Sequence, residues 1–187
     1  MEFECADEVG YPLEQVFALV RDDMPALRPF LPDVDEITVL ERKDEPDGVR
    51  LINLWRASSR SVPSVVQRFV SADLLCWKDH AFWPRELREA RWRLEPKVGG
   101  TLFECTGTTA LLPGAREGTT KIRVRGDLRV YPERLPGVPR FLASRVRGTI
   151  EKFVVDMLVP NMSSMAKGVR GYFEDAARRG AAGPRAD

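Results

Sequence analysis

The sequence is poor in the residues that build most metal centres and many enzyme active sites. Its 187 residues include one histidine, His80, and three cysteines, Cys5, Cys76 and Cys105. The cysteines are odd in number and far apart, so neither a disulfide framework nor a zinc site is expected, and a reducing compartment fits best. No His-Glu-x-x-His, Cys-x-x-Cys, Gly-x-Ser-x-Gly or phosphate-binding glycine loop occurs. We therefore expect no metal and no cofactor.

Long apolar runs and an excess of charge of one sign are also missing. No run approaches the roughly 18 apolar residues that span a bilayer. The formal net charge is +1, so no overall field favours nucleic acid or acidic lipid. Residues 1–4 lack the basic and apolar regions of a signal peptide. These absences predict a cytoplasmic protein without nucleic-acid binding or stable membrane insertion.

The first two thirds of the chain alternate between apolar and polar residues, the period-two pattern of half-buried strands. The clearest stretch is 119–131, where alternate residues from Ile122 to Val130 are apolar or glycine. A short helix is predicted after Pro12, and 60–70 reads as either a strand or a short helix. No βαβ alternation occurs, which argues against a parallel sheet. The predicted strands cover 2–9, 35–45, 49–58, 74–83, 85–95, 101–112 and 119–131.

The last part of the chain has a helical period instead. From Val146 to Tyr172, apolar residues recur every three or four positions, which predicts a buried stripe on one long helix. The stripe shifts by one position after Met157, and Pro160 follows, so a bend is expected near Pro160. The small, polar tail at 180–187 is predicted to be frayed and flexible. A long apolar helix needs a broad apolar partner, which a curved antiparallel sheet would supply.

Three segments resemble a known superfamily: 13–22 (LEQVFALVRD), 33–40 (DVDEITVL) and 148–153 (GTIEKF). They are similar to the START-like (SRPBCC) superfamily, the polyketide cyclase/dehydrase and lipid transport group, and the resemblance covers nearly the whole chain. It implies an α+β helix-grip fold, in which a curved antiparallel sheet of about six to seven strands wraps around a long C-terminal helix. It implies a single domain over 1–179, with a hydrophobic cavity for a lipid, a polyketide or a similar small molecule. The prolines within 25–32 and Pro160 depart from the superfamily's pattern.

Candidate ligand-binding residues fall on the predicted inner faces of the strands and on the helix stripe. The four tryptophans suit a flat apolar ligand, or they fill a core. Asn53 and Asp79 share these faces, so each needs a partner or a wet cavity, unless the register is shifted by one residue. Methionines on the stripe suit an adaptable wall or an ordinary core. The candidates are Asn53, Trp55, Trp77, Trp83, Trp92, Val124, Leu128, Phe153, Met157 and Met165.

Three functions remain open from the residues alone. The first is non-catalytic binding of a hydrophobic small molecule, oriented by Asn53 or Asp79. The second is an enzyme of the aromatase/cyclase or dehydratase kind, with Asp79, Glu104 or His80 moving protons inside the same cavity. The third is a ligand-free protein-interaction domain. We expect binding, because residues of dedicated chemistry are few and the alternation favours an outward position for His80.

Overall fold

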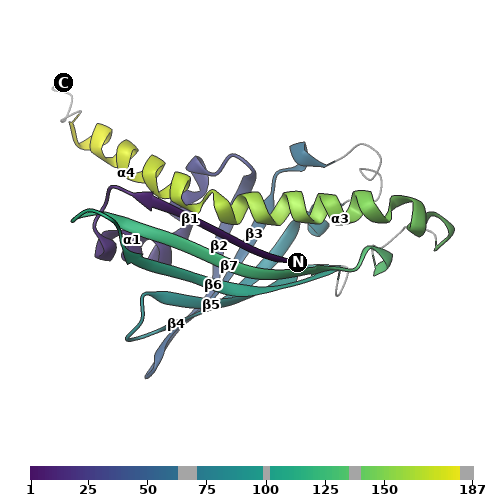
Figure 1. The fold of residues 1–187 in the computed structure, drawn as a ribbon, viewed down its shortest axis with the longest axis horizontal. Coiled ribbons are helices and arrows are strands. Elements are labelled where there is room, and N and C mark those ends of the chain that lie inside the picture. The colour runs from purple at the N-terminus through teal and green to yellow at the C-terminus, as the bar shows by residue number, and fades with distance from the viewer. Residues whose placement is uncertain (63–70, 99–101, 135–139, 182–187) are drawn as a thin grey trace.

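The computed structural model describes residues 1–62, 71–98, 102–134 and 140–181. Within these ranges one antiparallel sheet has the strand order β1-β7-β6-β5-β4-β3-β2 (Figure 1). The strands are β1 (Glu2–Val9), β2 (Val34–Glu45), β3 (Gly48–Ala57), β4 (Cys76–Pro84), β5 (Glu89–Pro96), β6 (Phe103–Pro113) and β7 (Thr120–Val130). The α-helices are α1 (Leu13–Asp22), α3 (Arg140–Ser163) and α4 (Met165–Ala181), and the 3₁₀ helix η1 covers Met24–Phe30.

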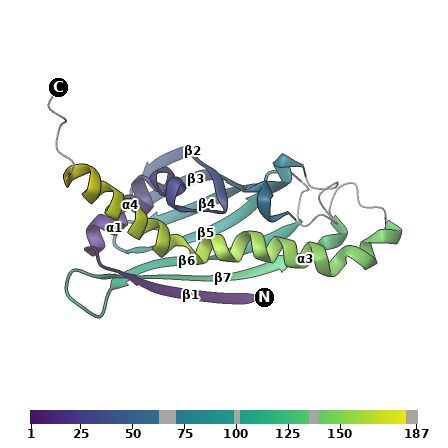
Figure 2. The ribbon, with the colours of Figure 1, turned by 90° about the horizontal axis from the view of Figure 1, so that it is seen from above.

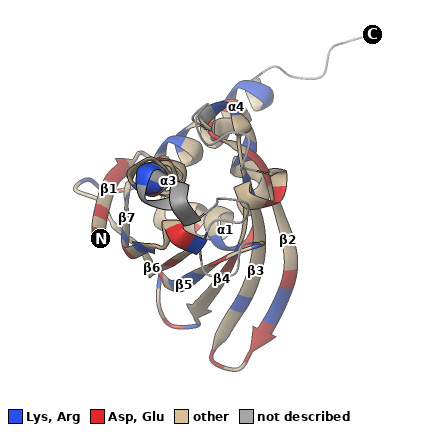
Figure 3. Ribbon diagram, turned by 90° about the vertical axis from the view of Figure 1, so that its right-hand side faces the viewer, with Lys and Arg blue, Asp and Glu red and all other residues tan. Residues whose placement is uncertain are grey.

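The expected α+β helix-grip fold is confirmed. The sheet curves from β1 round to β2, and the helices lie across its open side (Figures 2 and 3). Helix α3 contacts β7 and β1, whereas α4 contacts β1, η1 and α1. The helices therefore cover the concave face of the sheet, and the core lies between them.

The period-two pattern decides which side chains face the helices. On β3, Leu51, Asn53 and Trp55 are buried, and the residues between them are more exposed. On β7, Ile122 and Val124 are buried in the same way. The inward direction predicted for these residues is confirmed, because a side chain on a strand points to the same face as its second neighbour.

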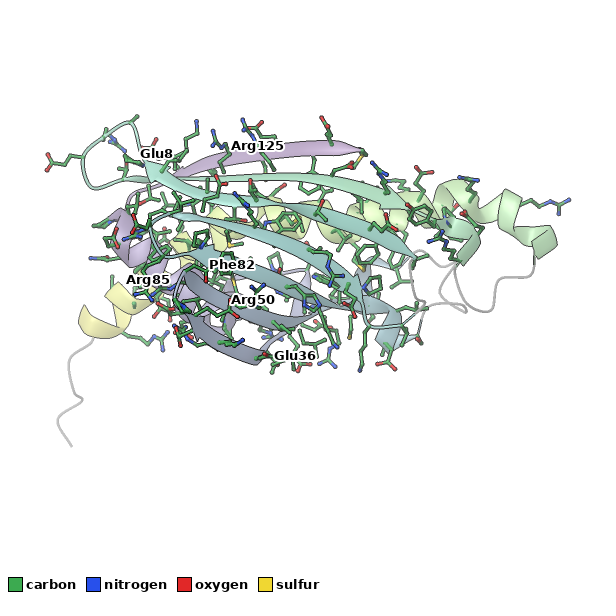
Figure 4. All side chains as sticks on the ribbon, turned by 90° about the horizontal axis from the view of Figure 1, so that it is seen from below. Glu8, Glu36, Arg50, Phe82, Arg85 and Arg125 are labelled. Carbon is green, nitrogen blue, oxygen red and sulfur yellow. The ribbon has the colours of Figure 1, made fainter. Side chains whose placement is uncertain are left out.

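The convex face of the sheet carries many charged residues (Figure 4). The Arg50 guanidinium lies over the Phe82 ring, 5.0 Å from its centroid. Arg125 pairs with Glu4 of the neighbouring strand at 3.0 Å. This face is therefore a solvated surface of mixed charge.

The predicted long helix is divided into two, with the boundary at Ser164 and not at Pro160. Pro160 has no N–H, so the carbonyl four residues before it loses its helical donor, yet α3 continues to Ser163. The side chains of Asn161, Ser163 and Ser164 then donate to backbone carbonyls three or four residues back, at 2.6, 2.9 and 2.9 Å. Such bonds compete with the backbone ladder and bend helices. The change of direction thus follows the proline by four residues.

Other boundaries also differ from expectation. The chain turns at 85–88, so β5 begins at Glu89 and is shorter than the predicted strand. Residues 180–181 belong to α4, and 182–187 lie outside the described residues. The ambiguous segment 60–70 begins in a 3₁₀ turn at Ser59–Ser61, and 63–70 also lies outside the described residues. No helix in the described part of the chain is both long and apolar enough to cross a membrane.

Candidate functional site

A cavity of about 60 Å³ lies between the concave face of the sheet and the covering helices. Four tryptophans and three methionines contribute to its wall, together with smaller apolar side chains. Strands β3, β4 and β5 supply most of the floor, while α1, η1, α3 and α4 supply the cover. The cavity is thus assembled from segments that lie far apart in the sequence.

Two of the tryptophans form a stacked pair on the floor. Trp55 and Trp77 lie directly opposite each other on β3 and β4. Their ring centroids are 6.2 Å apart and their planes differ by 12°. Trp83, farther along β4, packs edge-on against Phe17 of α1 with centroids 5.5 Å apart. These contacts hold flat aromatic surfaces along the cavity wall.

Trp92 owes its position to two glycines. Gly107 and Gly126 lie opposite each other on β6 and β7. A side chain added at Gly107 would clash with the indole ring, and one added at Gly126 would clash with the Phe3 ring and press on the indole. The ring therefore occupies space that a larger residue would fill. Trp92 Nε1 donates to Thr109 Oγ1 at 3.0 Å, so this indole N–H is satisfied within the wall.

Three polar atoms in the cavity wall lack a partner. Asn53 and Asp79 lie directly opposite each other on β3 and β4, and Trp55 follows Asn53 on the same face. Asn53 Oδ1, Trp55 Nε1 and Asp79 Oδ1 are buried and make no hydrogen bond to any described residue. Asn53 is 2% exposed, so solvent does not reach its side chain from outside. Unpaired buried polar atoms are uncommon in folded proteins and call for an explanation.

Asp79 has an unusual proton affinity. Burial in the apolar wall raises the pKa of its carboxyl from 3.8 to about 7, while a side-chain hydrogen bond from Asn53 acts in the opposite direction. No lysine, arginine or histidine is among the described residues that line the cavity. The carboxyl is therefore about half protonated near neutral pH.

The other two candidate catalytic residues, His80 and Glu104, are not among the residues that line the cavity. His80 Nε2 lies on the outer face, 3.1 Å from Glu95 Oε2. Glu104 is exposed and accepts a hydrogen bond of 3.1 Å from the Tyr131 hydroxyl. Because both alternate with inward-facing residues on their strands, the sheet separates them from the cavity.

The candidate ligand-binding residues divide into two groups. Leu128 of β7 and Phe153 and Met157 of α3 are buried in the core and are not among the residues that line the cavity. The others line it: Asn53, Trp55, Trp77, Trp83, Trp92, Val124 and Met165.

Sequence reasoning missed several lining residues. Met162 lies on the helix stripe and could have been found there, but Asn161 beside it could not, because a polar residue is not marked by an apolar period. Thr109 lies on a strand whose two faces look alike in the sequence, and Met24 comes from the 3₁₀ helix η1. Irregular segments carry no period from which a direction can be read.

A second, smaller cavity adjoins the first. It has a volume of about 30 Å³ and lies under the junction of α3 and α4, against β1 and β7. Val124, Met162 and Met165 line both cavities. The two methionine side chains therefore form part of the partition between the two spaces.

The family model described as "Protein of unknown function (DUF2505)" matches residues 6–167. The chain belongs to this family. A search of curated protein sequences with this DUF2505 protein found no match. Solved structures similar to it include TTHA0849 from Thermus thermophilus, with 20% identity, a TM-score of 0.63 and coverage of 95% of this chain and 99% of that chain. The Zhui aromatase/cyclase from Streptomyces sp. R1128 is similar at 13% identity, with a TM-score of 0.61 and 98% of each chain covered. Both likenesses concern the fold.

Proposed function

We propose that this DUF2505 protein binds a hydrophobic small molecule, of lipid or polyketide-like character, in the cavity beneath α3 and α4. The observation that carries the proposal is an apolar cavity whose wall holds three buried polar atoms without a partner among the described residues. Each such atom costs about 1–3 kcal/mol if nothing pairs with it. A ligand that pairs with these atoms would recover this free energy and would also bury the aromatic wall. The Zhui aromatase/cyclase shares the fold, which supports a small-molecule role.

The size of the cavity sets a condition on binding. A volume of about 60 Å³ holds a few water molecules, whereas an apolar cavity that binds benzene has a volume of about 150 Å³. A ligand must therefore displace side chains. The methionines of the cover can move at low cost, because thioether chains are unbranched and flexible. Rotation of Met162 and Met165 would also join the second cavity to the first.

The test is saturable binding of an apolar dye, N-phenyl-1-naphthylamine, which fluoresces in apolar surroundings. Ala81 lines the cavity and is 6% exposed, so Ala81→Met fills space that the ligand needs. Ala18 is exposed on α1, and Ala18→Met is the matched control. We expect wild type and Ala18→Met to bind the dye alike, and Ala81→Met to bind at least about tenfold more weakly.

Solvent extraction of the purified protein followed by mass spectrometry provides an independent measurement, in which a co-purifying apolar molecule is expected. Absence of saturable dye binding in the wild type, or unchanged binding in a folded Ala81→Met variant, would contradict the proposal. Circular dichroism establishes that the variant is folded. A protein that binds neither dye nor extracted ligand would instead favour the ligand-free interaction domain.

A second candidate function is proton-transfer catalysis of the cyclase or dehydratase kind, and Asp79 is the observation that favours it. A carboxyl with a pKa of about 7 in the cavity can both donate and accept a proton near neutral pH. In a dehydration, ionised Asp79 would remove a proton from carbon and return it to the departing hydroxyl, which leaves as water. The Asp79→Asn variant separates the two functions: a catalyst would keep ligand binding and lose turnover, whereas a carrier shows no turnover in either form.

A further inference from the structure

The three unpaired atoms are neighbours and differ in what they require. Asn53 and Asp79 are opposite each other across two strands, so their Cβ atoms lie about 5 Å apart. Trp55 is two residues farther along β3, about 7 Å away on the same face. Asn53 Oδ1 only accepts a hydrogen bond, Trp55 Nε1 only donates one, and Asp79 Oδ1 donates one when it carries the carboxyl proton. The group that satisfies them must supply one donor and two acceptor positions.

A hydroxyl group has this composition. Its hydrogen can be donated to Asn53 Oδ1, and its two lone pairs can accept from Trp55 Nε1 and from protonated Asp79. An ammonium group only donates and would leave the Trp55 N–H unpaired, whereas a ketone only accepts and would leave Asn53 Oδ1 unpaired. The stacked rings of Trp55 and Trp77 continue the same wall and suit an apolar body beside the polar group.

We infer that the cavity takes a ligand with a hydroxyl group on an apolar body, and that Asn53, Trp55 and Asp79 hold this hydroxyl. The inference rests on the proposed function and adds the chemical class of the ligand. A trapped water molecule offers the same donor and acceptors, so the experiment must distinguish a ligand hydroxyl from water. Specificity would follow from the three atoms, because a ligand without the hydroxyl leaves them unpaired.

Three probes of eight heavy atoms each differ only in the terminal group: benzyl alcohol, ethylbenzene and benzylamine. Isothermal titration calorimetry of the wild type at pH 5.5 keeps Asp79 mostly protonated. Without an anchor, burial of the alcohol's hydroxyl would make it bind about tenfold or more weakly than ethylbenzene. We expect it to bind at least as tightly as ethylbenzene.

Variants of the wall residues test whether the polar atoms of Asn53, Trp55 and Asp79 hold the hydroxyl group. Trp55→Phe removes the donor and Asn53→Leu removes the acceptor, and each is expected to lower the preference for alcohol over ethylbenzene by about tenfold. Trp77→Phe makes the same change in the stacked neighbour and keeps all three atoms, so its preference should match the wild type. If Trp55→Phe and Asn53→Leu keep the wild-type preference for benzyl alcohol over ethylbenzene, the three polar atoms are hydrogen-bonded to water and the inference is overturned.

Titrations repeated at pH 8.5, where Asp79 is mostly ionised, test the alternative that the cavity binds a cationic ligand. Asp79 is the one ionisable group among the described lining residues, and Lys78 and His80 of the same strand face outward. The Cys105 thiol lies near Asp79, and burial raises its pKa to about 12, so it stays neutral over this range. Benzylamine that binds more tightly than the alcohol as the pH rises would overturn the hydroxyl assignment. If none of the three probes binds, the proposed function itself is contradicted. If ethylbenzene binds equally to the wild type and all variants, and benzyl alcohol binds no more tightly than expected without the three polar atoms, only this inference is contradicted.

Discussion

Replacement of Asp79 by asparagine should change the pH dependence of stability in a defined direction. The pKa of Asp79 is about 7 in the folded protein and near 3.8 in an unfolded chain. Between these values the folded protein binds a proton that the unfolded chain has released, so the free energy of unfolding falls as the pH rises. Above about pH 7 the carboxyl is ionised in both states and the loss is complete. Asp79→Asn removes this dependence and keeps the shape of the side chain.

The magnitude follows from the part of that interval which lies above pH 5. At 1.36 kcal/mol for each pH unit, the roughly two units between pH 5 and the pKa of about 7 correspond to about 3 kcal/mol. This is an upper bound, because water that enters the cavity solvates the carboxylate. We expect Asp79→Asn to gain about 1–3 kcal/mol relative to wild type between pH 5 and pH 8.5.

Urea unfolding followed by far-ultraviolet circular dichroism at several pH values measures the difference between the two proteins. Asp7→Asn is the control. Asp7 pairs with Arg170 at 2.7 Å, and this hydrogen bond lowers the pKa of its carboxyl. The contribution of Asp7 is therefore complete above pH 5 and is lost only in acid, so the stability of Asp7→Asn relative to wild type should be constant between pH 5 and pH 8.5. A difference for Asp79→Asn that is equally flat would refute the reasoning that places a buried, uncompensated carboxyl in the cavity.

Two further predictions concern the wall around Trp92. Gly107→Ala should lower the free energy of unfolding by about 1–3 kcal/mol or more, because the added methyl clashes with the backbone carbonyl of Arg125 and with the Trp92 ring. Gly148→Ala, with nothing within 4 Å on an exposed turn of α3, should raise the free energy of unfolding by up to about 1 kcal/mol. Equal effects of the two variants in urea unfolding would contradict this prediction. Trp92→Phe should lower the free energy of unfolding by about 1–3 kcal/mol, because Thr109 Oγ1 loses its hydrogen-bond donor. Adding Thr109→Val to this variant should lower it little further, because both partners of the hydrogen bond are then absent. Fully additive losses in the double-mutant cycle would show that the hydrogen bond is unimportant.

The order of the elements and the direction of most strand side chains could be predicted from the sequence. Alternation on β3 placed Asn53 and Trp55 inward, and the same parity on β4 placed Asp79 inward and His80 outward. These predictions needed only the geometry of a strand, in which successive side chains point to opposite faces. The helical period of the last segment likewise identified a buried stripe, although the chain changes direction at Ser164, after Pro160, because side-chain hydrogen bonds to the backbone act beyond the proline.

Whether the space between the sheet and the helices is filled was decided only by the tertiary structure. Periodicity gives the direction of a side chain but not the distance to the surface that it meets, so Met157 and Met165 look alike in the sequence although only Met165 reaches the cavity. The paired glycines Gly107 and Gly126 admit the Trp92 ring, and their meeting depends on strand register. The sequence thus determined the inward direction of most side chains on the regular strands and on the helix stripe. Packing between distant segments decided that about 60 Å³ stays unfilled and that three polar atoms there remain unpaired among the described residues.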